Sequence, residues 1–209
     1  MTGWDELGQH WRACFELAWT AYGSGTTPVG AVLVDGAGEV VAPGVNARFA
    51  PAGSAPLAGS HVAHAEVIAL AALDARGSYP DHVLYTTLEP CLLCVGAAIM
   101  SSVGEVRFAG SDPYAGATTV LGGSNAHIDL TQTTFAGPLA GAPAAFAAGL
   151  LVEFCARRAG EGPVAAAYRE SAPAILAVAE VMASLELPAA AAAGAPLPAV
   201  YDGVIAALG

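Results

Sequence analysis

Residues 82–101 read HVLYTTLEPCLLCVGAAIMS, and this stretch changes character at its middle. The first half, HVLYTTL, is rich in β-branched and aromatic residues, which predicts a strand. The second half, over 91–101, has helical composition. A proline at position 90 marks the junction, and Cys91 and Cys94 lie three residues apart at the predicted helix start. The stretch therefore predicts a strand that leads into a helix, with two thiols at the helix N-terminus.

The chain on either side continues this alternation. Apolar residues at spacings of three and four predict an amphipathic first helix, and the DGAGE turn predicts a hairpin. The expected elements are a helix over 4–22, strands over 29–34 and 39–42, a helix over 63–76, a strand over 82–88, a helix over 91–101 and a strand over 105–109. This order predicts a three-layer α/β/α sandwich with a mixed central sheet whose last strands are parallel.

The pattern weakens past residue 110. A loop occupies 111–125, and the remaining sequence is rich in alanine and leucine. Helices are expected over 143–158, 163–185 and 198–208, with a low-complexity linker over 187–198. We expect a domain over 1–125, followed by an alanine-rich helical C-terminal extension over 126–209 that packs on the core or at an oligomer interface.

Composition and charge restrict the class of protein. The chain has 209 residues, is 55% hydrophobic and contains four cysteines, which suits a globular domain in a reducing compartment rather than a disulfide scaffold. The N-terminus lacks a signal pattern, and no apolar run reaches about 18 residues, so we expect a cytoplasmic protein without a membrane span. The net charge of −11 and the absence of lysine argue against a polyanionic partner. A local patch of Arg157, Arg158 and Arg169 remains an alternative.

Two short motifs are candidates for one site. Alone, the CxxC of Cys91 and Cys94 fits a redox pair, a metal site or two small core residues. His64, in the HAE of 64–66, is by itself more typical of a cap or core histidine. Each motif lies at the predicted N-terminus of a helix, and two helices on one sheet can bring these ends together. One nitrogen and two sulfurs then suit Zn²⁺, with the fourth position open as in catalytic sites.

Glu66 follows His64 by two residues and cannot easily share the metal. It can stand beside a metal-bound water, which is the place of a general base. The metalloprotease pattern HExxH is absent, because residues 61–65 read HVAHA. His61 is more simply interpreted as a loop histidine with a local hydrogen bond, and Cys14 and Cys155 as buried small hydrophobes.

The order H-A-E, 23 residues, then P-C-x-x-C resembles the cytidine/deoxycytidylate deaminase superfamily of zinc-dependent nucleobase and nucleoside deaminases. PVGAVLV at 28–34, GVN at 44–46 and VRFAGSD at 106–112 resemble the branch that contains tRNA adenosine deaminases and guanine or cytosine deaminases. The likeness runs from about Pro28 to Gly116 and does not cover residues 125–209. It implies that the domain over 1–125 is a zinc deaminase domain with a cytidine deaminase-like fold.

The resemblance also implies roles for individual residues. His64, Cys91 and Cys94 would hold one Zn²⁺ per chain, with a bound water or hydroxide, and Glu66 would move the protons. The substrate would be contacted by Asn46, by the backbone around Ala65 and Pro90, and by Asp112 and Tyr114. For Asp112 and Tyr114, a turn aspartate and a packing tyrosine remain equally good interpretations.

Three hypotheses for the function follow. The first is hydrolytic deamination of a small nucleobase, nucleoside or related heterocycle with release of ammonia. The second is a tRNA-specific adenosine deaminase, and the third is a non-catalytic zinc-bearing domain. We expect the first, because a tRNA enzyme needs basic residues to meet phosphates. Glu66 argues against the third, and the apolar extension prompts the expectation of a homodimer.

Overall fold

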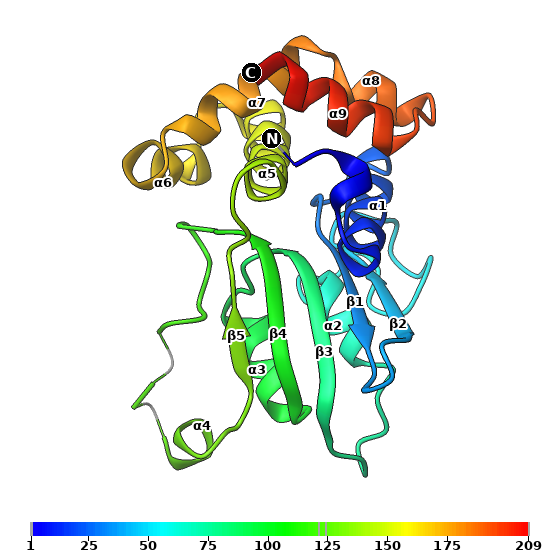
Figure 1. Ribbon diagram of the computed structural model, residues 1–209, viewed down its shortest axis with the longest axis vertical. Coiled ribbons are helices and arrows are strands. Elements are labelled where there is room, and N and C mark those ends of the chain that lie inside the picture. Colours follow the sequence, from blue (N-terminus) through cyan, green and yellow to red (C-terminus); the bar gives the residue numbers. More distant parts are fainter. Residues whose placement is uncertain (1, 121, 124, 209) are drawn as a thin grey trace.

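A computed structural model describes residues 2–120, 122–123 and 125–208. It shows one five-stranded sheet with helices on both faces (Figure 1). The strands are β1 (Gly30–Val34), β2 (Val40–Val45), β3 (Tyr79–Leu88), β4 (Val103–Gly110) and β5 (Thr134–Ala136). The helices are the 3₁₀ helix η1 (Trp4–Glu6), α1 (Gln9–Gly23), α2 (Ala65–Leu70), α3 (Leu92–Met100), α4 (Ala126–Asp129), α5 (Ala142–Ala159), α6 (Pro163–Ser171), α7 (Ala174–Ser184), α8 (Leu187–Ala192) and α9 (Leu197–Leu208).

The strands lie in the order β2-β1-β3-β4-β5. β1 is antiparallel to β2 and to β3, whereas β4 is parallel to both β3 and β5. Parallel neighbours need a crossover connection, and α3 supplies it between β3 and β4. The prediction of an α/β/α sandwich with a mixed sheet and a helical C-terminal region is confirmed.

Each face of the sheet is covered by helices from different parts of the chain. α2 and α3 lie on one face and α1 lies on the other, while α5 packs across the end of the sheet beside β4 and contacts the clusters of both faces (Figure 1). All five residues of β1 are buried, as expected for a strand covered on both sides. α2 approaches β2 so closely that a Cβ on Gly44 would lie 2.0 Å from the carbonyl oxygen of Ala65. Glycine at position 44 therefore sets where α2 begins.

The C-terminal helices gather at one end of the sheet (Figure 1). Phe146 of α5 packs edge-on against Phe15 of α1, with ring centroids 5.9 Å apart, and lies 4.9 Å from the ring of Tyr201 in α9. These three side chains are almost fully buried in one hydrophobic cluster. Helices from both ends of the chain thus share a core. The division of the chain at residue 125 stays a prediction.

Several predicted boundaries were wrong for local reasons. The first helix is interrupted after η1, and the helix expected over 63–76 ends at Leu70, before a turn in which the Asp74 side chain accepts from the backbone N–H of Arg76. The helix expected over 163–185 is two helices, because Pro173 cannot donate a backbone hydrogen bond.

The C-terminal boundaries need correction too. The linker expected over 187–198 contains α8, which packs on α1 through the buried Leu187. α4 and β5 were not predicted, and two residues of the expected 111–125 loop, Leu121 and Ser124, lie outside the described residues. No helix in the described ranges is both long and apolar enough to cross a membrane.

The close approach at Gly44 yields a prediction about stability. Gly44→Ala should lower the free energy of unfolding by about 2 kcal/mol or more, because its Cβ would overlap the Ala65 carbonyl. Gly96→Ala in α3 is the matched control: no atom lies within 4 Å of its Cβ, so a helical alanine should be neutral or stabilising by up to about 1 kcal/mol. Denaturant unfolding measures both, and equal stability of the two variants would contradict the prediction.

Candidate active site

The N-termini of α2 and α3 meet beside the end of β3. His64 is the N-cap residue of α2, Cys91 is the N-cap residue of α3, and Cys94 lies in the first turn of α3. Nδ1 of His64 is 3.5 Å from Sγ of Cys91 and 3.4 Å from Sγ of Cys94, and the two sulfurs are 3.6 Å apart. The structure therefore brings together three residues that are separated by up to thirty positions in the sequence.

The spacing of these three atoms fits a tetrahedral zinc. Zn–S bonds of about 2.3 Å and Zn–N bonds of about 2.0 Å, at tetrahedral angles, separate two sulfurs by about 3.8 Å and a sulfur from a nitrogen by about 3.5 Å. The observed triangle matches these edges, and each of its three residues offers one ligand atom. A site with three protein ligands and an open fourth position is typical of catalytic zinc.

The surroundings of the two thiols favour a role as metal ligands over a role as packed core residues. The Sγ atoms of Cys91 and Cys94 lie 3.6 Å apart, within hydrogen-bond distance, and this contact, with further help from His64, lowers the pKa of Cys91 to about 4. The same contact, together with burial, raises the pKa of Cys94. Metal binding requires that this thiol lose its proton. Both residues lie in the first turn of α3, where the helix dipole also favours thiolate.

Glu66 is buried directly behind this triangle. Its side chain is 4% exposed, and its Oε1 accepts a hydrogen bond of 3.2 Å from Oγ1 of Thr86, a fully buried residue of β3. Burial raises the pKa of the Glu66 carboxyl above its usual range. A carboxyl group with a raised pKa can both accept and return a proton near neutral pH.

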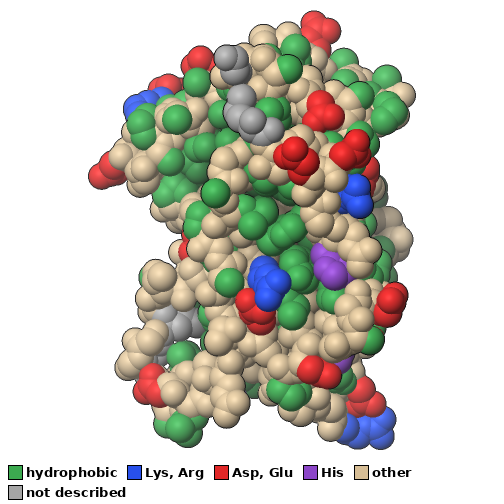
Figure 2. All heavy atoms as spheres, viewed as in Figure 1, with side chains coloured by type: hydrophobic (Ala, Val, Ile, Leu, Met, Phe, Trp, Pro, Cys, Tyr) green, Lys and Arg blue, Asp and Glu red, His purple; other side chains and the backbone are tan. Residues whose placement is uncertain are grey.

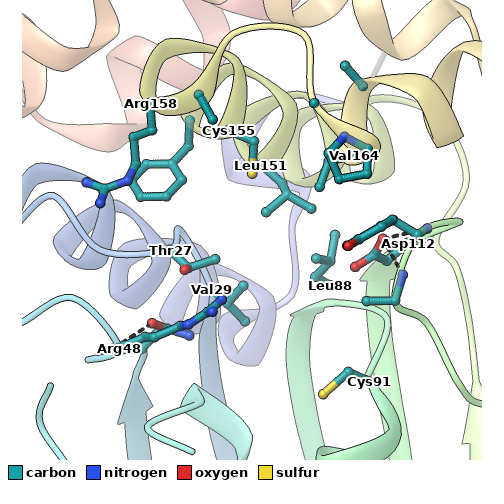
Figure 3. A pocket seen from close by; sticks show the side chains of 18 of the residues that line it. Thr27, Val29, Arg48, Leu88, Cys91, Asp112, Leu151, Cys155, Arg158 and Val164 are labelled. Carbon is teal, nitrogen blue, oxygen red and sulfur yellow. Dashed lines mark hydrogen bonds between the residues drawn. The ribbon is translucent and has the colours of Figure 1, made fainter. Parts of the chain in front are cut away.

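The site opens onto a cavity of about 510 Å³, a volume suited to a small organic ligand. His64, Glu66 and Cys91 line it, and apolar side chains form much of the rest. In Figure 3, Cys91 lies below the opening, with Val29 and Leu88 above it and Leu151 and Val164 on the opposite wall. Such a cavity can hold a flat heterocycle over the metal site.

Asn46 presents its amide group to this cavity. Its Oδ1 accepts hydrogen bonds from Oγ1 of Thr26 at 3.0 Å and from the backbone N–H of Arg48 at 3.1 Å. Among the described residues no acceptor is found for its Nδ2, and the residue lines the cavity. The amide therefore has its donor side available for a ligand.

Of the other residues that the sequence predicted to contact the substrate, two line the cavity and two do not. Asp112 and Tyr114 line the cavity, whereas Ala65 and Pro90 do not. The Oδ1 of Asp112 accepts from the backbone N–H groups of Tyr114 and Ala115, so Asp112 also serves as a turn residue. Tyr114 is 54% exposed, so it lies outside the hydrophobic core.

Sequence reasoning missed the wall formed by α5 and α6. Leu151, Phe154, Cys155, Arg158 and Val164 all line the cavity. Figure 3 shows Cys155 and Arg158 across the cavity from the loop residues Thr27 and Arg48. Cys155 is half-buried: it packs against the hydrophobic core, as expected of a small hydrophobe, and it also lines the cavity. Cys14 is fully buried, as expected. No sequence motif marks this wall, because its residues become neighbours of the zinc ligands only through the tertiary fold.

Comparison with known proteins supports this arrangement. Residues 5–110 match the family described as the cytidine and deoxycytidylate deaminase zinc-binding region, which is about half of the chain. The chain belongs to the cytidine and deoxycytidylate deaminase superfamily. The matched region contains all three candidate zinc ligands and Glu66 but none of the α5–α6 wall.

Two curated relatives are tRNA-specific adenosine deaminases. The Haemophilus influenzae protein is 38% identical over 109 residues, which cover 51% of this chain and 59% of the relative. The Bacillus subtilis protein is 36% identical over 120 residues, which cover 56% of this chain and 68% of the relative. The chain thus spans less than two thirds of the first of these relatives.

Solved structures of two kinds share the fold. A structure from a study of A-to-I editing by tRNA:A34 deaminases superposes with a TM-score of 0.55 and 26% identity, covering 66% of this chain and 97% of that one. Guanine deaminase from Nitrosomonas europaea superposes with a TM-score of 0.54 and 25% identity, covering 70% and 83%. The superfamily fold therefore extends over about two thirds of the chain.

The ligand triangle predicts how zinc content responds to substitution. The wild-type chain should contain one zinc per chain, and Cys94→Ala should contain far less, because two remaining ligands hold the ion weakly. Cys155→Ser should keep its zinc, because Cys155 is not part of the triangle. Elemental analysis of the purified proteins measures this. Equal zinc in all three proteins would place the metal elsewhere.

Proposed function

We propose that this protein is a zinc-dependent hydrolytic deaminase that removes an exocyclic amino group from a nucleobase. The observation that carries the proposal is the position of Glu66. It is buried, it lines the same cavity as His64 and Cys91, and Thr86 holds one of its carboxylate oxygens. A purely structural zinc site does not require a buried carboxyl group with a raised pKa beside its ligands, whereas a catalytic site does.

The chemistry follows from the placement of these groups. His64, Cys91 and Cys94 would hold the metal, and zinc, when bound, supplies an activated water for hydrolysis. Glu66 accepts a proton from the attacking water and delivers it to a ring nitrogen of the base. It then transfers the second proton to the departing amino group, which leaves as ammonia while a carbonyl group replaces it. The hydrogen bond from Thr86 keeps Oε1 fixed, so the other carboxylate oxygen can face the substrate.

The first candidate substrate is adenosine in tRNA. Both curated relatives are named tRNA-specific adenosine deaminase. They are 38% and 36% identical to this chain across the region that holds the zinc motifs. They support this alternative better than the expectation of a small-molecule substrate. The donor side of Asn46 provides a hydrogen bond to the base or to its ribose.

A small purine or related heterocycle is the second candidate, and the α5–α6 wall favours it. The wall places apolar side chains over the cavity, which suits a ligand that is taken in whole. On the face that Figure 2 shows, the arginine side chains lie apart from one another among scattered acidic groups. The fold shared with guanine deaminase at 25% identity is consistent with this candidate.

A substrate panel with the Glu66→Gln variant tests the proposal. The zinc-loaded wild type should release ammonia from at least one of adenosine, guanine, guanosine, cytosine, cytidine and a tRNA anticodon stem-loop. Glu66→Gln should keep zinc and lose about 10²- to 10⁴-fold in kcat, because proton transfer is removed while the fold is kept. Retained activity in this variant would contradict the assignment of Glu66.

The panel also separates the two candidate substrates. Turnover of the stem-loop alone would establish the tRNA candidate, and turnover of a free base or nucleoside would establish the small-molecule candidate. Homodimeric assembly and a cytoplasmic location stay predictions.

A further inference from the structure

We propose that Arg48 and Arg158 form a phosphate subsite at the mouth of the cavity, and that the substrate is therefore a nucleotide whose base enters the zinc pocket. The inference rests on the proposed function and deepens it. Both residues line the cavity, one from the loop after β2 and the other from the end of α5. Figure 3 shows both on the side of the cavity opposite to Asp112.

The first observation is that these two arginines lack carboxylate partners. Among the described residues, ion pairs join Arg76 to Asp74, Arg107 to Glu105, Arg157 to Glu153 and Arg169 to Glu161. Arg12, Arg48 and Arg158 have no such pair, and of these three only Arg48 and Arg158 line the cavity. Glu66, Glu89 and Asp112 also line the cavity, but no ion pair joins any of them to either arginine, so both guanidinium groups keep their hydrogen-bond donors available to a ligand.

The second observation is that both guanidinium groups are held in place. The Cζ atom of Arg158 lies 4.2 Å from the ring centroid of Phe49 and 5.4 Å from that of Phe154. Arg48 lies 5.2 Å from the same Phe49 ring, and its Nη2 is 3.4 Å from Nδ1 of His61. Stacking on a shared aromatic ring limits the freedom of both side chains, so less entropy is lost when they bind an anion.

The third observation concerns the position of Arg48 relative to Asn46. The Asn46 side chain accepts the backbone N–H of Arg48, so a residue that faces the base or ribose is tied to one that faces the cavity mouth. Guanidinium groups bind phosphate oxygens through charge-assisted, often bidentate hydrogen bonds. The order from the metal site outward then matches a nucleotide: base, ribose, phosphate.

The alternative of a patch formed by Arg157, Arg158 and Arg169 is not what the structure shows. Arg157 binds Glu153, and Arg169 binds Glu161, so only Arg158 of the three remains available. Its partner is Arg48, which lies 110 residues earlier in the chain. The phosphate can be the terminal group of a mononucleotide or an internal group of an RNA strand, and the test distinguishes these sources.

Binding is measured by calorimetry in the zinc-loaded Glu66→Gln variant, so that no ligand is consumed. The ligands are adenosine, guanosine and cytidine, their 5′-monophosphates, and an anticodon stem-loop. At least one monophosphate, or the stem-loop, should bind about tenfold or more tightly than its nucleoside. Adding Arg48→Gln or Arg158→Gln should weaken that binding about tenfold or more and leave nucleoside binding unchanged.

Two further variants separate a phosphate contact from a general charge effect. Arg76→Gln removes the same charge from an exposed arginine that does not line the cavity, and it should leave all affinities unchanged. Arg158→Lys keeps the charge and should recover part of the binding that Arg158→Gln loses. If Arg158 only fastens α5 to the loop that carries Phe49, Arg158→Gln will lower the melting temperature and weaken nucleoside and nucleotide binding equally, which would overturn the proposal.

The outcomes also separate this inference from the proposed function. Tight phosphate-dependent binding, without ammonia release by the chain that retains Glu66, would contradict the deaminase and support the subsite. Deamination of a nucleoside whose 5′-monophosphate binds no more tightly would support the deaminase and contradict the subsite. Failure of every monophosphate and of the stem-loop to bind more tightly than nucleosides would rule the subsite out.

Discussion

The contact between Gly44 and the Ala65 carbonyl is the constraint on which the site depends. It allows α2 to begin directly against β2, and so fixes His64 and Glu66 at the first turn of that helix. The β3–α3 junction then brings Cys91 within 3.5 Å of His64. A shift of α2 by the size of one methyl group would open the ligand triangle, because zinc tolerates only a few tenths of an ångström in its ligand distances.

Buried hydrogen bonds hold the α5–α6 wall of the cavity in place. The hydroxyl of Tyr22 in α1 donates to the buried carboxylate of Glu153 in α5, which also binds Arg157 at 3.0 Å. Tyr168 of α6 donates its hydroxyl to the carbonyl oxygen of Ser111, in the loop that carries Asp112. These bonds connect α5 and α6 to the first helix and to the rim of the cavity. The C-terminal helices are therefore part of the site, and their removal would expose both the core and the pocket.

Sequence patterns predicted the parts of the molecule that local chemistry specifies. The zinc motif and Glu66 could be found because each residue type has a chemical reason for its position, and the strands could be found from their composition. Pro173 broke a predicted helix, and α8 formed where alanine-rich sequence had indicated a linker, because burial of Leu187 outweighs low complexity. The α5–α6 wall could not be predicted, since the neighbours of Cys155 and Arg158 depend on how α5 packs on β4.

The net charge of the chain and the two arginines of the cavity act on a substrate over different distances. The net charge of −11 acts over roughly a Debye length, about 8 Å at physiological salt, and repels a strand in proportion to the number of phosphates that come within that range. Arg48 and Arg158 act at contact, on one phosphate. A mononucleotide meets the attraction of the pair and little of the repulsion, whereas a tRNA meets both. The same two arginines therefore favour small nucleotides over RNA, unless an RNA places a single flipped nucleotide in the pocket and keeps its remaining phosphates away from the acidic surface.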